Sequence, residues 1–124
     1  MLNRLRDNKE IKIFIATNKR KDPTKKILDF LNWNMFFDDH YCIDSFPQNN
    51  PNKSNLLSFI MKKYCIRNNN CLYIGDRYAD YIAAETSNIK FIGVTWGHKE
   101  LNKEKYNHIN SIDTPSADKI LRLL

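Results

Sequence analysis

A short apolar run that ends in acidic residues constrains this chain more than any other feature. The run Leu72–Ile74 precedes Gly75 and Asp76, and Asp80 follows four residues later. Such a run is typical of a buried strand that ends at the edge of a parallel sheet. Open α/β sheets bind ligands beyond the carboxyl ends of their strands. Two carboxylates at such a point suit a hard divalent cation such as Mg²⁺, which often shares its site with a phosphate.

Apolar, β-branched runs alternate with helical patterns along the chain. The runs predict strands at Ile11–Ala16, Tyr41–Ile43, Cys71–Ile74, Phe91–Val94 and, at an edge, His108–Ile112. The 3.6-residue patterns predict helices at Met1–Asn8, 22–32, 53–64, Tyr78–Ser87, Glu100–Tyr106 and Ser116–Leu124. Alternation with short loops is typical of an α/β fold, a Rossmann-like parallel sheet flanked by helices.

Two of these helices carry recognisable starts. Asp22 is a candidate N-cap, with Pro23 at the first helical position of the second helix. The turn-like segment Gln48–Asn52 precedes a helix that we expect to begin at Lys53 or Ser54. Its apolar residues recur at the helical period and predict a buried face of Leu56, Leu57, Ile60, Met61 and Tyr64.

The length and composition are those of one ordinary globular domain. The 124 residues predict a single domain, 1–124, and the 42% hydrophobic and 27% charged residues are usual for soluble proteins. No apolar run approaches the length of a membrane span, and the N-terminal residues lack the apolar segment of a signal peptide. We therefore expect a cytoplasmic protein without a membrane partner.

The chain is basic, with a formal net charge of +6. One local cluster, Lys19-Arg20-Lys21 with Lys25-Lys26, stands out, but no nucleic-acid-binding motif accompanies it. We interpret the excess as a solvated surface and expect no nucleic-acid partner. A basic rim that attracts phosphorylated substrates is the functional alternative.

The three cysteines are interpreted as reduced thiols. Cys42, Cys65 and Cys71 form no CxxC pair, and an odd number argues against a disulfide framework. Together with His40 they match no common zinc-ligand spacing. We expect partly buried, free cysteines.

Polar residues with complementary chemistry follow the predicted strands. Thr17 and Asn18 come after the first strand, Lys53 opens the helix before the third, and Asp76 and Asp80 follow that strand. The Thr17 hydroxyl and the Asn18 amide can donate to a phosphate oxygen, and Lys53 can neutralise its charge. Asp76 and Asp80 can hold Mg²⁺ directly or through water. The sequence therefore predicts that these side chains converge on one sheet edge around a phosphate monoester.

Four stretches in order resemble the haloacid dehalogenase superfamily, in particular its phosphoglycolate-phosphatase-like branch. The segment 13–19 (IFIATNK) looks like its second motif, Lys53 lies where the third-motif lysine belongs, and 75–80 (GDRYAD) looks like the fourth motif. The segment 92–97 (IGVTWG) is similar to the strand and turn that follow. Ser54 replaces the proline that usually comes after the lysine.

This resemblance implies Mg²⁺-dependent hydrolysis of a small phosphorylated metabolite. It implies Thr17 and Lys53 as catalytic residues, Thr17, Asn18 and Lys53 as phosphate contacts, and Asp76 with Asp80 as metal ligands. The non-functional alternatives are a strand-end hydroxyl, a surface lysine, and acidic residues that merely favour the start of the next helix.

The family's nucleophile motif, Asp-x-Asp, is absent from the 124 residues: Asp7 stands alone and Asp38-Asp39 are adjacent. The resemblance thus implies a truncated haloacid-dehalogenase-type core without its first strand and cap, inactive alone. The strands 11–16 and 71–74 would then pair directly, accept a complementing N-terminal polypeptide between them, or promote a homodimer. A non-enzymatic phosphate-binding or regulatory module and one half of a split phosphatase are the alternative functions.

Overall fold

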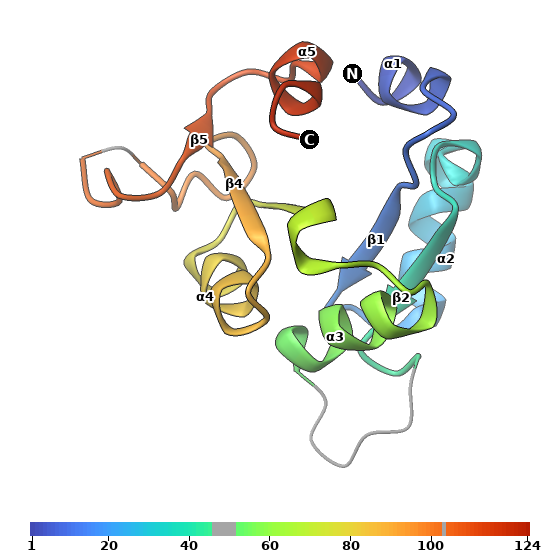
Figure 1. Cartoon of the computed structure of the whole chain (residues 1–124). Coiled ribbons are helices and arrows are strands. Elements are labelled where there is room, and N and C mark those ends of the chain that lie inside the picture. The colour runs from blue at the N-terminus through green and yellow to red at the C-terminus, as the bar shows by residue number, and fades with distance from the viewer. Residues whose placement is uncertain (46–51, 103) are drawn as a thin grey trace. The chain divides into compact units, whose positions relative to one another are not determined.

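The computed structural model describes residues 1–45, 52–102 and 104–124 (Figure 1). The chain divides into two compact units, Met1–Ile60 and Met61–Leu124, and each is described by itself. The expectation of a single domain over 1–124 stays a prediction. Of the turn expected at Gln48–Asn52, all but Asn52 lies outside the described residues.

The first unit contains a pair of parallel strands with helices around it. Its elements are α1 (Leu2–Asp7), β1 (Phe14–Thr17), α2 (Lys21–Leu31), a 3-10 turn at Asn34–Phe36, β2 (Asp39–Cys42) and most of α3 (Lys53–Lys63). Strands β1 and β2 lie side by side, with Thr17 opposite Cys42 (Figure 1). Thr17 is therefore the last residue of its strand, at the carboxyl end where the sequence predicts the site.

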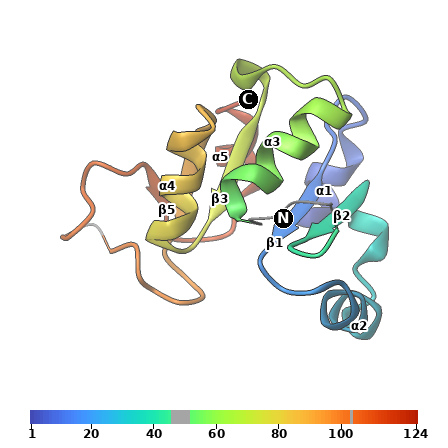
Figure 2. The ribbon, with the colours of Figure 1, turned by 90° about the horizontal axis from the view of Figure 1, so that it is seen from below.

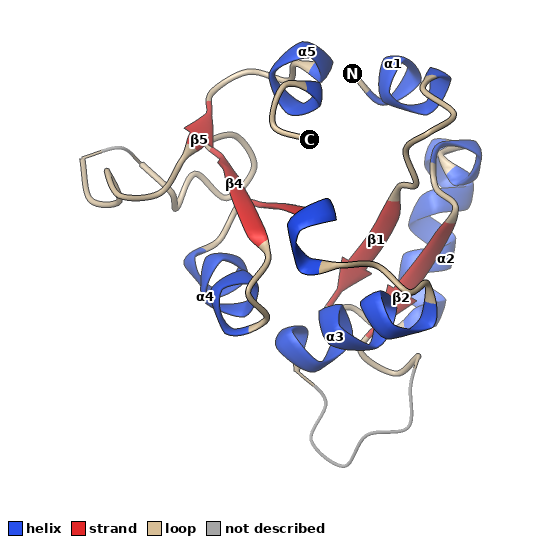
Figure 3. Cartoon of the chain, in the orientation of Figure 1, coloured by secondary structure: helices blue, strands red, loops and turns tan. Residues whose placement is uncertain are grey.

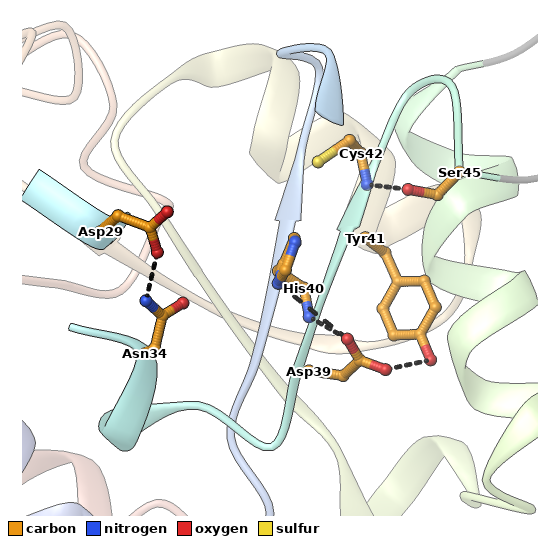
Figure 4. A network of polar contacts seen from close by, with 7 residues as sticks. All are labelled: Asp29, Asn34, Asp39, His40, Tyr41, Cys42 and Ser45. Atoms are coloured by element: carbon orange, nitrogen blue, oxygen red, sulfur yellow. Dashed lines mark hydrogen bonds and ion pairs between the residues drawn. The ribbon is translucent and has the colours of Figure 1, made fainter. Parts of the chain in front are cut away.

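Local polar contacts fix β2 and the turns on either side of it (Figure 4). The Tyr41 hydroxyl donates to Asp39 Oδ2 at 3.2 Å, and the Cys42 amide donates to Ser45 Oγ at 2.7 Å. The Asn34 side-chain amide donates to Asp29 at 2.7 Å, which joins the 3-10 turn to the last turn of α2. These contacts set the path of the chain away from the carboxyl end of β2.

The second helix begins earlier than the sequence suggests. Asp22 is not its N-cap: the cap position is Arg20, and Asp22 and Pro23 lie in the first turn. The first helical amide, that of Lys21, donates instead to the side chain of Asp44 at 2.9 Å. An acceptor beyond the end of β2 thus replaces a local cap, which no sequence pattern around the helix reveals. The expected end is confirmed, because Asn32 is the C-cap in the left-handed conformation.

Helix α3 follows its prediction closely. The Asn52 side chain accepts from the Asn55 amide at 2.8 Å, which satisfies a free donor in the first turn. The expected apolar face is buried, with Leu56, Leu57, Ile60 and Met61 each at most 9% exposed. Tyr64, at the end of that face, is half-buried.

The second unit has a three-stranded parallel sheet in the order β3-β4-β5 (Figure 3). Its elements are a 3-10 turn at Asn68–Asn70, β3 (Leu72–Gly75), α4 (Tyr78–Thr86), β4 (Lys90–Val94), β5 (Ser111–Ile112) and α5 (Ala117–Leu121). Helix α4 packs on β3 and β4 (Figure 2). Ala83 and Ala84 of α4 are buried, and β4 contributes the buried residues Phe91, Ile92 and Val94. Strand β5 is at the edge, as the sequence predicts.

The helix expected at Glu100–Tyr106 is wrong. The described part of this segment is a series of turns, in which the Asn102 side chain accepts from the Lys105 amide at 2.8 Å. Leu101, only 2% exposed, is drawn into the core beside Gly93. The asparagine side chain that binds a nearby backbone amide and the single deeply buried leucine both favour a packed loop. A helix with an apolar stripe would need several buried residues at helical spacing.

The architecture confirms an α/β fold of parallel strands flanked by helices. Direct pairing of the strands 11–16 and 71–74, one of the three arrangements considered, stays a prediction. Among the described residues, no helix has the length and apolar character needed to cross a bilayer.

Candidate active site

The carboxyl end of β1 presents a hydroxyl and a loop of backbone amides. Thr17 is half-buried, and its Oγ1 accepts from the Lys19 amide at 3.1 Å. A hydroxyl that accepts one hydrogen bond keeps its own proton to donate. The Lys19 carbonyl in turn accepts from the Ile43 amide at 3.3 Å, which anchors this loop to the segment after β2. Thr17 and the exposed Asn18 are thus held where a phosphate oxygen can be met.

Lys53 reaches the same strand end. Its Nζ donates to the carbonyl of Ala16, the residue before Thr17, at 3.3 Å. The two residues are 37 positions apart, and the first turn of α3 bridges that separation. The structure therefore places the Lys53 ammonium at the strand end that carries Thr17.

Asp76 follows directly on β3, and a loop from after β4 wraps its carboxylate. The His98 amide donates to Asp76 Oδ2 at 3.3 Å. Gly97 has φ +81°, and a Cβ on it would lie 2.7 Å from the same oxygen. A residue with a side chain would therefore be strained and would collide with the carboxylate. Gly97 is the residue that allows the loop to approach Asp76.

Asp80 lies on the first turn of α4 with both carboxylate oxygens engaged. Oδ1 accepts from the Tyr73 hydroxyl at 3.2 Å, and Oδ2 accepts from the Arg77 amide at 3.3 Å. The second contact is one that an acidic residue commonly makes at the start of a helix. Asp80 therefore has the contact that the non-functional alternative expects of it. A carboxylate oxygen has a second lone pair, so this contact is compatible with metal binding.

Tyr73 has its pKa raised above the ordinary value of 10.0 by burial first and then by the nearby charge of Asp80. The phenol therefore stays protonated and remains a hydrogen-bond donor to Asp80 throughout the neutral range.

The donor set of the second unit fits part of a magnesium site. Asp76 and Asp80 offer carboxylate oxygens at the end of one strand, and Mg²⁺ typically takes one or two carboxylates together with water and phosphate oxygens. No group of three or more His, Cys, Asp or Glu side chains gathers around a point within residues 1–45, 52–102 and 104–124. The chemistry of the two aspartates is thus suited to Mg²⁺, with the remaining positions for water or a substrate.

Three features of the site are absent from the sequence-based prediction. These are the Tyr73 hydroxyl, the loop at Gly97 and His98, and the Arg77 side chain. Arg77 is exposed, with a guanidinium nitrogen 3.1 Å from the His98 ring nitrogens. No spacing rule relates a tyrosine to a carboxylate seven residues later. The contact of Tyr73 with Asp80 is therefore apparent only in the folded structure, where the strand and the helix come together.

The predicted site residues thus form two pairs. In the first unit Lys53 contacts Ala16, the residue before Thr17. In the second unit Asp76 follows β3, and Asp80 on α4 lies close to Gly75. The convergence of the two pairs around one phosphate stays a prediction.

Comparison with known families now places the chain in one of them. The sequence profile described as haloacid dehalogenase-like hydrolase matches residues 1–94. The chain belongs to this family, and the class of protein is that of the haloacid dehalogenase-like hydrolases.

Relatives with curated names include phosphoglycolate phosphatases. The chain is 27% identical over 111 residues to one from Pseudomonas putida, which covers 90% of this chain and 38% of that protein. It is 29% identical over 97 residues to one from Aquifex aeolicus, which covers 78% of this chain and 45% of that protein. The chain therefore spans about two fifths of the length of these relatives.

Solved structures show the same fold. A predicted phosphatase from Clostridium acetobutylicum superposes with a TM-score of 0.75 at 26% identity, covering 98% of this chain and 55% of that one. A haloacid dehalogenase-like hydrolase from Streptococcus pneumoniae superposes with a TM-score of 0.81 at 19% identity, covering 99% and 56%. The chain matches just over half of each of these structures.

Proposed function

We propose that this chain carries the phosphate-binding and metal-binding residues of a Mg²⁺-dependent phosphate monoester hydrolase of the phosphoglycolate-phosphatase type. Thr17, the Asn18 amide and Lys53 contact the phosphate, and Asp76 and Asp80 hold the cation. The substrate is a small phosphorylated metabolite. The protein is cytoplasmic, with neither a membrane nor a nucleic acid as partner.

The observation that carries this proposal is the contact of Lys53 Nζ with the Ala16 carbonyl at 3.3 Å. It supports the proposal that a lysine at the start of α3 and a threonine at the end of β1 act in one site. A lysine held beside a strand-end hydroxyl is suited to an anion, since the ammonium supplies charge and the hydroxyl supplies direction.

Each residue has a distinct task in this proposal. Thr17 and the Asn18 amide orient the phosphate by donating to its oxygens. Lys53 neutralises charge that builds on the transferring group. Bound Mg²⁺ would screen the phosphate from an anionic nucleophile, and Asp76 and Asp80 would keep that cation at the end of β3.

We expect the 124-residue chain alone to lack useful turnover, because its sequence has no Asp-x-Asp nucleophile. The test is hydrolysis of a generic aryl phosphate by the purified chain with Mg²⁺. Robust turnover that disappears in Asp76→Ala would contradict this expectation.

Phosphate binding tests the proposal without requiring turnover. We expect the chain to bind inorganic phosphate or phosphoglycolate in isothermal titration calorimetry. Lys53→Met should weaken binding by about tenfold, the effect of losing one charge-assisted hydrogen bond. Lys62→Met is the matched control, because Lys62 is an exposed lysine near the other end of the same helix. Equal weakening by both substitutions would indicate general charge attraction and would contradict a built site.

The second candidate function is one half of a split phosphatase. It is suggested by the absence of an Asp-x-Asp motif from the 124 residues. In this case a separate polypeptide supplies the nucleophile and a strand. A phosphate-binding or regulatory module without hydrolysis is distinguished by tight ligand binding that no added polypeptide converts into turnover.

A further inference from the structure

Tyr73 is a half-buried ionisable side chain to which the proposed phosphate chemistry gives no task. It lies on β3, two residues before Gly75, and its ring packs edge-on against Phe91 with the ring centres 6.0 Å apart. Its hydroxyl is directed at the Asp80 carboxylate, to which it donates at 3.2 Å. The hydroxyl of a strand residue thus reaches a carboxylate on the following helix.

Two hydrogen bonds hold the Asp80 carboxylate, and Gly75 leaves room for it. Tyr73 holds Oδ1, the Arg77 amide holds Oδ2, and the absence of a side chain on Gly75 leaves the space that Asp80 occupies. A Cβ on Gly75 would lie 2.6 Å from the Asp80 Cβ and 2.7 Å from Oδ2. The Asp80 carboxylate therefore lies close to Gly75, which is the last residue of β3 and the residue before Asp76.

We infer that Tyr73 is a positioning residue, whose hydroxyl holds the Asp80 carboxylate at the end of β3 in the orientation in which Asp76 and Asp80 together bind a divalent cation. This inference rests on the proposed function, since it assumes that these two aspartates take the metal. Groups that hydrogen-bond to ligating carboxylates commonly change metal affinity by 10–100-fold, because they fix the orientation of the ligand.

The test is Mn²⁺ binding to the full chain, followed by electron paramagnetic resonance of the free ion. We expect Asp76→Asn to abolish specific binding and Tyr73→Phe to weaken it by about tenfold. Tyr81→Phe is the matched control, because the Tyr81 ring also contacts Phe91, at 5.7 Å, but from α4. It should leave the affinity unchanged.

A double-mutant cycle shows whether Tyr73 acts through Asp80. In an Asp80→Asn background, adding Tyr73→Phe should cause no further loss of Mn²⁺ affinity. A purely structural role would reduce the melting temperature of Tyr73→Phe while leaving the affinity of the folded protein unchanged, which would overturn the inference. Independent, additive losses of Mn²⁺ affinity from Tyr73→Phe and Asp80→Asn would also overturn the inference.

The outcomes separate this inference from the proposed function. If the chain binds Mn²⁺, Asp76→Asn abolishes binding and Tyr73→Phe binds like the wild type, the inference alone fails. If the wild type does not bind Mn²⁺, or Asp76→Asn binds equally well, both fail. Should Tyr73→Phe not fold, the ring resonances of Tyr73 in the wild-type chain provide the second measurement. They should shift when Mg²⁺ saturates the protein, and unchanged resonances at saturation would overturn the inference.

Discussion

Two glycines lie opposite each other on neighbouring strands of the second sheet, and a side chain is disfavoured at each position for a different reason. Gly75 on β3 is opposite Gly93 on β4. A Cβ on Gly75 would meet the Cβ of Asp80 at 2.6 Å, whereas a Cβ on Gly93 would meet a terminal methyl of Leu101 at 2.9 Å. The first neighbour is tied to the backbone of α4, and the second is the mobile end of a side chain. Gly75 is therefore required by the position of Asp80 in the candidate site, whereas Gly93 is required by the packing of Leu101.

We expect Gly75→Ala to destabilise the protein by about 2 kcal/mol, the usual cost of overpacking, and to displace Asp80. Gly93→Ala should cost less, because Leu101 can change rotamer. The free energies of unfolding from urea titrations measure both, and Mn²⁺ affinity reports the displacement. A larger loss of stability in Gly93→Ala than in Gly75→Ala would contradict this account.

Much of the candidate site was predictable at the level of single residues. Thr17, Lys53 and Asp76 lie at the end or the start of predicted elements. The structure has Thr17 as the last residue of β1, Lys53 as the first of α3 and Asp76 directly after β3. Their joint role in one site stays a prediction. Tyr73 could not be selected in this way. Its role depends on the turn from β3 into α4, which folds its hydroxyl back onto a carboxylate seven residues ahead.

Among the secondary-structure elements, one carboxylate joins α1 to the residue that precedes β1. Asp38 accepts from the Arg6 guanidinium at 2.9 Å and from the Ile13 amide at 2.6 Å. Desolvation alone would raise the pKa of Asp38, but the hydrogen bond from Ile13 and the charge of Arg6 outweigh it and hold the pKa below the ordinary 3.8. The ionised form is therefore the one that stabilises the fold.

This direction gives a pH dependence with a definite sign. A lowered pKa means that the charge of Asp38 contributes stability above pH 3.8, and that this contribution is lost as the pH falls further. We expect Asp38→Asn to reduce the free energy of unfolding by about 1 kcal/mol at pH 7, the scale of one hydrogen bond. The difference from the wild type should vanish in acid. Urea denaturation at several pH values is the measurement, and a difference that grows towards low pH would contradict it.

Helix α2 offers a contrast between its two faces. Leu28 is 4% exposed, whereas Phe30, two residues later, is 88% exposed. We expect Leu28→Ala to cost about 2–5 kcal/mol, because it leaves a cavity in the core. Phe30→Ser should change the free energy of unfolding by less than about 0.5 kcal/mol, since its ring already lies in solvent. A large effect of Phe30→Ser on thermal unfolding would show that a contact covers this ring.

The elements that were predicted correctly are those whose own residues decide them. Helix α3 carries its apolar face and its starting Asn52 in sequence, and β4 is a continuous apolar run. The start of α2 was misplaced because its first amide is satisfied by Asp44, 23 residues away. The segment 100–106 was misjudged because the burial of Leu101 beside Gly93 outweighs helix propensity, and neither partner is local.

At the scale of the whole molecule, each unit has its own parallel sheet. In the described residues β1 pairs with β2 in the first unit, and β3 pairs with β4 in the second. Strand edges with exposed amides and carbonyls recruit further strands, from a second copy or from another polypeptide. In the split-phosphatase alternative, a separate polypeptide supplies such a strand.

We expect a polypeptide that ends an apolar strand with Asp-x-Asp to stabilise the chain and to restore turnover of an aryl phosphate in Mg²⁺. Binding to the folded form alone adds about 2.7 kcal/mol at 100 times the dissociation constant, which a thermal melt detects. Replacing the first aspartate of that motif by asparagine should keep the stabilisation and remove the turnover, because the strand would still pair while the nucleophile is gone. Turnover with no change in melting temperature would point to a contaminating phosphatase. If neither property changes at large molar excess, the chain is not one half of a split enzyme, and phosphate binding without hydrolysis becomes the function that its Thr17 and Lys53 support.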